Sequence, residues 1–136
     1  MDANQMFKDD YRQRADVNKA RAAEYRDLYS AYNDSDDIDH KNVAKMYHNL
    51  WIDYTYLSSH YGIMATSVKP EEQALNVSIV LKRLAENHRN LALVMEKVRK
   101  SYTVPDDYLT YLENFHRDRS NGYERDAEYF TKNSRS

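Results

Sequence analysis

The sequence predicts an all-α protein: an elongated antiparallel bundle of four main helices with a short fifth helix at the C-terminus. The chain of 136 residues holds only 2 Gly and 2 Pro, which helix interiors disfavour and β-rich folds need in their turns. Apolar and aromatic residues recur at alternating spacings of four and three, which places them on one stripe of a helix. The 13 Tyr, 3 Phe and 1 Trp supply apolar surface that a disordered chain lacks, although 31% of the residues are charged. This length fits one domain, residues 1–136.

Residues 4–32 form the first predicted helix. Its stripe is small and polar in the middle and aromatic in the second half: Tyr11, Ala15, Asn18, Ala22, Tyr25, Tyr29 and Tyr32. The segment 33–37 breaks the helix, because Asn, Asp and Ser bond their own backbone, and its acids suit the start of the next helix. It does not fit a calcium-binding EF-hand loop, since the glycine is missing and Lys45 takes the place of the twelfth-position Glu.

Residues 38–61 form the second predicted helix and residues 70–102 the central one. The second carries the stripe Val43, Tyr47, Leu50, Tyr54, Leu57 and Tyr61, and Gly62 stands where a helix-ending residue is expected. The central helix, with Pro70 in its first turn, has the longest stripe: Val77, Leu81, Leu84, His88, Leu91, Met95, Val98 and Tyr102. At 1.5 Å per residue it would be about 45–50 Å long, which is why we expect an elongated bundle.

The first turns of the central helix are apolar on nearly every side. A helix of this kind must be covered on every side, which a small bundle rarely achieves alone. We therefore expect this end to be a subunit interface in a homodimer. The residues expected in the interface are Ala74, Leu75, Val77, Ile79, Val80 and Leu81.

The C-terminal part predicts a fourth helix over about 105–120 and a short fifth helix over about 123–130. Thr103 fits the N-cap of the fourth helix, with Asp106 three residues on. Asn121-Gly122 looks like the end of that helix. The short helix would turn Tyr123, Ala127 and Phe130 inward.

Two features could carry chemistry. His88 occupies the middle of an apolar stripe, where a polar residue can fix helix register; the alternatives are a core histidine bonded to a tyrosine hydroxyl, or a pH-responsive or ligand-binding residue. Glu113 and His116 form Glu-x-x-His, the motif of di-iron bundles. Such a site needs a second motif and two further Glu, so the pair is a weak metal candidate, and we expect neither a metal nor another cofactor.

A basic face runs along the central helix outside its apolar stripe. It could contact phosphates between tyrosine side chains, or it could be a solvated face that suits the negative end of the helix. The chain as a whole has a formal charge of −2, whereas nucleic-acid-binding domains are usually basic. The residues of this basic face are Lys82, Arg83, Arg89, Lys97, Arg99 and Lys100.

The expected function follows mainly from elimination. The chain has no Cys, no Gly-rich phosphate loop, no nucleophile elbow, no signal-peptide pattern and no apolar run of membrane-spanning length. We expect a cytoplasmic, non-enzymatic adaptor or regulator that acts through contacts with another protein and through self-association, since Tyr suits interfaces. The alternative is a nucleic-acid-associated accessory protein, such as a phage or plasmid encodes. A metal-dependent bundle enzyme is the third hypothesis.

Overall fold

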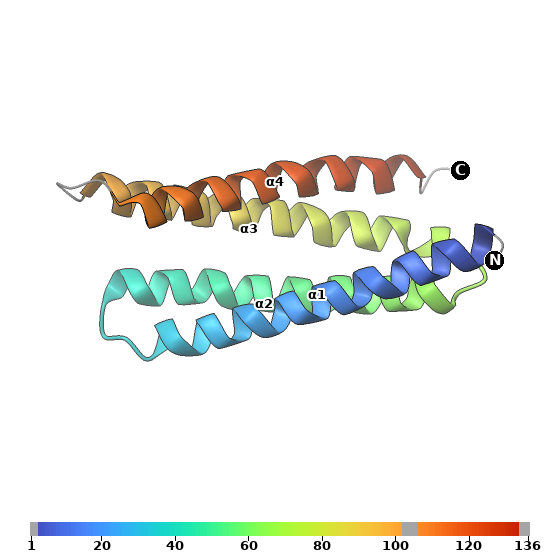
Figure 1. Cartoon of the computed structure of the whole chain (residues 1–136), viewed down its shortest axis with the longest axis horizontal. Coiled ribbons are helices and arrows are strands. Elements are labelled where there is room, and N and C mark those ends of the chain that lie inside the picture. Colours follow the sequence, from blue (N-terminus) through green and yellow to red (C-terminus); the bar gives the residue numbers. More distant parts are fainter. Residues whose placement is uncertain (1–2, 102–105, 134–136) are drawn as a thin grey trace.

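The protein, described by a computed structural model over residues 3–101 and 106–133, is built from four long α-helices in this part of the chain. They are α1 (Ala3–Asn33), α2 (Ile38–Thr66), α3 (Ala74–Ser101) and α4 (Asp107–Asn133), with a short 3₁₀ turn at Pro70–Gln73. Figure 1 shows two antiparallel hairpins, α1 with α2 and α3 with α4. The hairpins meet mainly through α2 and α3, whereas the backbones of α1 and α4 do not pack closely. The predicted antiparallel four-helix bundle is therefore confirmed.

Aspartates cap two of the helices. Asp37 starts α2 by accepting hydrogen bonds from the backbone N–H groups of Asp39 and His40, as its acidic segment predicts. Asp106 does the same for α4, where its Oδ1 accepts from Tyr108 N and Leu109 N. Asp106 is thus the cap itself rather than the third residue after a cap. The predicted cap, Thr103, lies outside the described residues.

Neither glycine ends a helix, contrary to the prediction from the sequence. α2 continues past Gly62 to Thr66, and α4 runs unbroken through Gly122 to Asn133, so the described residues contain no separate fifth helix. Neither glycine has a positive φ, the conformation that a helix-ending glycine supplies. In α4 the reason is packing: the buried stripe Glu113, His116, Ser120, Tyr123, Ala127 and Phe130 keeps its three–four spacing straight across Gly122.

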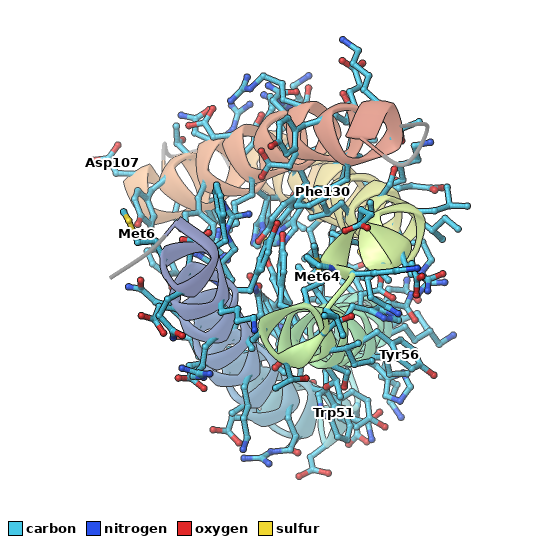
Figure 2. The ribbon with its side chains drawn as sticks, turned by 90° about the vertical axis from the view of Figure 1, so that its right-hand side faces the viewer. Met6, Trp51, Tyr56, Met64, Asp107 and Phe130 are labelled. Carbon is cyan, nitrogen blue, oxygen red and sulfur yellow. The ribbon has the colours of Figure 1, made fainter. Side chains whose placement is uncertain are left out.

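The core combines aliphatic side chains of α2 and α3 with aromatic rings of α1, α2 and α4. Leu50, Leu57, Leu84 and Leu91 are almost completely buried, in the same core cluster as tyrosine and phenylalanine rings from three helices. In the end-on view of Figure 2, Met64 and Phe130 lie in the interior, whereas Tyr56 lies on the outer surface. The backbones of α1 and α4 stand farther apart than those of α2 and α3, and the candidate site lies on this side of the bundle.

Candidate functional site

A hydrogen-bonded chain of tyrosines and histidines crosses the centre of the bundle. Tyr54 Oη lies 2.7 Å from His88 Nε2 and 2.8 Å from Tyr123 Oη. His88 Nδ1 lies 2.8 Å from His116 Nδ1, and the two imidazole rings stack at 5.0 Å. His88 is fully buried and His116 is 3% exposed. The central chain, Tyr123–Tyr54–His88–His116, therefore joins α2, α3 and α4 through polar groups rather than apolar contacts.

Two arginines fix the direction of the hydrogen bonds in the central chain. Arg21 donates to Tyr123 Oη at 2.9 Å, and Arg119 donates to Tyr54 Oη at 3.2 Å. Guanidinium groups only donate, so each arginine occupies an acceptor position on a tyrosine oxygen. Only one assignment of the remaining protons then gives every proton within the central chain an acceptor. Tyr123 donates to Tyr54, Tyr54 donates to His88 Nε2, and His88 Nδ1–H donates to His116 Nδ1. His116 then carries its proton on Nε2.

Both histidines are neutral at neutral pH. Burial, together with the nearby His116 and Arg119, lowers the pKa of His88 to about 2. Burial and the charge of Arg119 lower the pKa of His116 to about 4. Burial also raises the pKa of Tyr54 well above its usual value. The central chain consequently carries no charge of its own, which is what a buried polar cluster requires.

A groove follows the line between α1 and α4, where the two hairpins stand apart. It consists of three hollows of about 310, 370 and 510 Å³, met in this order along α1 from Phe7 to Tyr32. We name them the Phe7, Asn18 and Tyr25 hollows. The Phe7 hollow lies among α1, Tyr129 of α4, the end of α2 and the connector that follows it. At the Asn18 hollow the Arg21–Tyr123 hydrogen bond crosses from α1 to α4. The three hollows, together named the α1–α4 groove, all border α1, and each contains at least one residue of α4.

The Tyr25 hollow is the largest of the three and opens above the central chain. Its walls are mostly apolar and aromatic: Leu28, Tyr32, Tyr108, Leu112 and Phe115. Tyr25, Tyr47, His116 and Arg119 also line it, and the Arg119 guanidinium lies 4.4 Å from the centre of the Phe115 ring. Glu24 and Asp27 of α1 are exposed at this hollow. Apolar walls with a few convergent polar groups are typical of binding sites of this volume.

The predicted interface residues divide into two groups. Ala74, Val77, Val80 and Leu81 are buried within the chain's own core, so the bundle covers more of this helix than expected. Leu75 and Ile79 are 54% and 45% exposed. The homodimer itself stays a prediction, and of the six predicted interface residues these two remain available for it.

Four of the six residues of the basic face lie in ion pairs with carboxylates of the same molecule. Arg83 pairs with Asp53, Arg89 with Glu124, Arg99 with Glu113 and Lys100 with Glu96. Lys82 and Lys97 form no such pair within the described part of the chain. The pairing reduces the positive charge that this face offers to phosphate, and nucleic-acid binding stays an untested prediction.

Glu113 and His116 do not converge on a common point. Glu113 accepts from Arg99 at 2.8 Å and pairs with Arg117 at 3.2 Å, which lowers its pKa, while His116 belongs to the central chain. Over residues 3–101 and 106–133, no group of three or more Asp, Glu or His is placed to hold a metal ion. Over the same ranges, no helix combines the length and hydrophobicity that crossing a membrane requires.

The sequence pattern pointed to His88 but missed its surroundings. His88 does bond to a tyrosine hydroxyl, as one of the readings expected. The roles of Arg21, Arg119 and His116 were missed, because a stripe shows which residues face inward but not which side chains meet across the bundle. One signal was available: His116, Ser120 and Tyr123 share a stripe with Phe130 once Gly122 is read as helical.

Comparison with protein-family models, with curated proteins and with solved structures found no match in any of the three.

Proposed function

We propose that the protein is a non-enzymatic adaptor that binds a helix of a partner protein in the α1–α4 groove. The observation that supports this is the series of three hollows, which follow residues 7–32 of α1. At 1.5 Å per residue this is about 37 Å, the length of a partner helix of about seven turns. Amphipathic helices bind in such grooves through side chains spaced every three, four or seven residues.

Exposed apolar side chains at the groove support the same proposal. Phe7 and Tyr129 at one end, and Tyr108 at the other, are each at least 60% exposed although they line a hollow. Tyrosines offer large contact areas with few rotatable bonds, which is why protein interfaces are rich in them. A partner helix would cover these rings. Self-association through Leu75 and Ile79 would leave the groove free, because neither residue lines a hollow.

Site-specific photo-crosslinking tests the proposal. A benzophenone amino acid is placed at Leu28 or Tyr108, which line the Tyr25 hollow, or at Leu93 of α3 as a control that is 53% exposed and lines none of the hollows. In cells of the source organism, we expect crosslinks from the first two positions to the same helical segment of one protein.

A synthetic peptide of that segment should bind the purified protein. Leu28→Asp should weaken the binding of this peptide roughly tenfold or more, since it places a charge in an apolar contact. The Leu93→Asp control should leave binding unchanged. The proposal fails if Leu93 gives the same products, or if the peptide binds both variants alike.

A further inference from the structure

The Tyr25 hollow holds hydrogen-bonding groups without partners. Tyr25 and Tyr47 are 5% and 4% exposed, yet neither hydroxyl forms a hydrogen bond within the described part of the chain. The only fully buried side-chain polar atom that lacks a partner there is Asn18 Oδ1. The hydroxyls of Tyr25 and Tyr47 therefore keep a small accessible area, and both residues line the Tyr25 hollow. Buried hydroxyls usually have a partner, so these two offer a place for a bound group.

Arg119 brings a positive charge to the same place. Its guanidinium is half-buried between Phe115 and the central chain, where it uses one N–H on Tyr54 Oη. Within the described residues no carboxylate lies within ion-pairing distance of it. A charge that is removed from water without a counter-ion is costly, and the remaining N–H groups form a fork that matches a carboxylate.

We infer that the Tyr25 hollow is a carboxylate subsite, which an acidic side chain of the partner helix fills; this rests on the function proposed above. The carboxylate would accept from Arg119 and from the hydroxyls of Tyr25 and Tyr47. The apolar side chains beside it would pack against Leu28, Leu112 and Phe115.

The rim of the hollow adds a second constraint on the partner. Glu24 and Asp27 are exposed there, and Asp27 pairs loosely with its neighbour Arg26 at 3.5 Å. These carboxylates would repel a segment that is acidic throughout. The fitting segment therefore presents one acid toward the floor and Lys or Arg toward α1, which is complementary in charge to both parts of the hollow.

A pair of small probes tests the chemistry of the subsite on the full chain. We compare 3-phenylpropionate with 3-phenylpropanamide, which has the same shape but no charge, by following backbone and arginine side-chain NMR signals. The carboxylate should bind with a Kd on the order of millimolar, as expected for a fragment of this size, and should shift the signals of Tyr25, Tyr47 and Arg119. The amide should bind roughly tenfold more weakly, because it loses the charge-assisted hydrogen bonds.

Variants of Arg119 make the test specific. Arg119→Gln should abolish the preference for the carboxylate, and Arg119→Lys, which keeps the charge if the glutamine variant does not fold, should reduce it. Arg125→Gln removes an exposed arginine of α4 that lines none of the hollows, and should leave the preference intact. Equal affinities for the two probes, or an unchanged preference in both Arg119 variants, would overturn the inference.

Two further outcomes separate the subsite from the proposed function. If the isolated acid binds with a micromolar or lower Kd, the subsite belongs to a free small molecule, and the inferred occupant is wrong. If the carboxylate preference is present but the crosslinking experiment identifies no partner helix, the adaptor function fails while the subsite chemistry stands. If a partner helix is found but carries no acid at this position, the inference alone fails.

Discussion

The Tyr54 hydroxyl makes all the hydrogen bonds that a hydroxyl can make. It donates to His88 and accepts from Tyr123 and Arg119, which uses its one proton and both lone pairs. Three groups therefore depend on a single oxygen in a site with no exposed surface. A buried group that loses its partner costs more than an average hydrogen bond contributes, so this oxygen should stabilise the fold strongly.

Tyr54→Phe should lower the free energy of unfolding by roughly 3 kcal/mol, since it leaves the acceptor His88 Nε2 without its donor and two donors without their acceptor. Tyr56→Phe is the matched control, because Tyr56 is 51% exposed and only two residues away. The control should change stability by less than about 0.5 kcal/mol. Urea denaturation at pH 7 measures both. Similar losses in the two variants would contradict the role of the central chain.

The two histidines should make the fold sensitive to acid. Their pKa values in the folded protein, about 2 for His88 and about 4 for His116, lie below the value near 6.5 of an unfolded histidine. The unfolded state therefore binds more protons over this range, and stability falls as the pH drops below about 6.5. Below pH 6.5, each histidine should lower the free energy of unfolding by about 1.4 kcal/mol per pH unit. This loss should continue down to about pH 4 for His116 and to a lower pH for His88.

Urea denaturation between pH 7 and pH 5 checks this dependence. His116→Gln should be less stable at pH 7 but should lose about half of the slope that the two histidines cause, because one titrating group is gone. Tyr54→Phe removes a hydroxyl and no histidine, so it should keep a steep slope at lower overall stability. A wild-type midpoint that does not change over this range would show that the histidine pair is not neutral in the fold.

At the scale of the helices, Gly62 and Gly122 cost stability without supplying a turn. Both lie inside α-helices at negative φ. An added Cβ would meet nothing within 4 Å at Gly62 and only the end of the Arg125 side chain, at 3.9 Å, at Gly122. Each Gly→Ala change should therefore raise the free energy of unfolding by about 0.5–1 kcal/mol. Thermal melting measures the gain. A loss at Gly122 would mean that a helix does end there, as the sequence alone suggested.

The helices could be predicted from the sequence because their apolar spacing is a local property. The stripes that contain Tyr54, His88 and Tyr123 face inward as predicted, and side-chain chemistry predicts the end of α1 near Asn33 and the start of α2 after Asp37. Glycine was misleading because it favours helix ends only on average. The central chain and the α1–α4 groove depend on how far each helix slides and rotates against its neighbours. Single-helix patterns do not contain that information.

The arrangement of the whole molecule, two hairpins joined through α2 and α3, leaves two different surfaces available. One is the groove between α1 and α4. The other is the start of α3, where the His60–Gln73 hydrogen bond keeps the last turns of α2 alongside. Leu75, Ile79 and Ile63 are each between 45% and 54% exposed there. Partner binding and self-association need not compete, because the two surfaces share no residue.

The start of α3 should mediate a weak homodimer. Full burial of a Leu or Ile side chain contributes about 1.5–3 kcal/mol, and these are half-exposed, so each should contribute about 1 kcal/mol. A two-fold axis counts Leu75, Ile79 and Ile63 twice, for a total of about 6 kcal/mol, against an association cost that starts near 4 kcal/mol. The difference of about 2 kcal/mol corresponds to a Kd of roughly tens of millimolar, so we expect light scattering to detect a minor dimer population between roughly 1 and 10 mM protein. Replacing Leu75 and Ile79 together by Lys should give a monomer that unfolds like the wild type, because neither side chain belongs to the core, whereas Leu93→Lys should still dimerise. A wild-type monomer at the highest of these concentrations would refute the interface and would leave the α1–α4 groove as the surface for protein contacts.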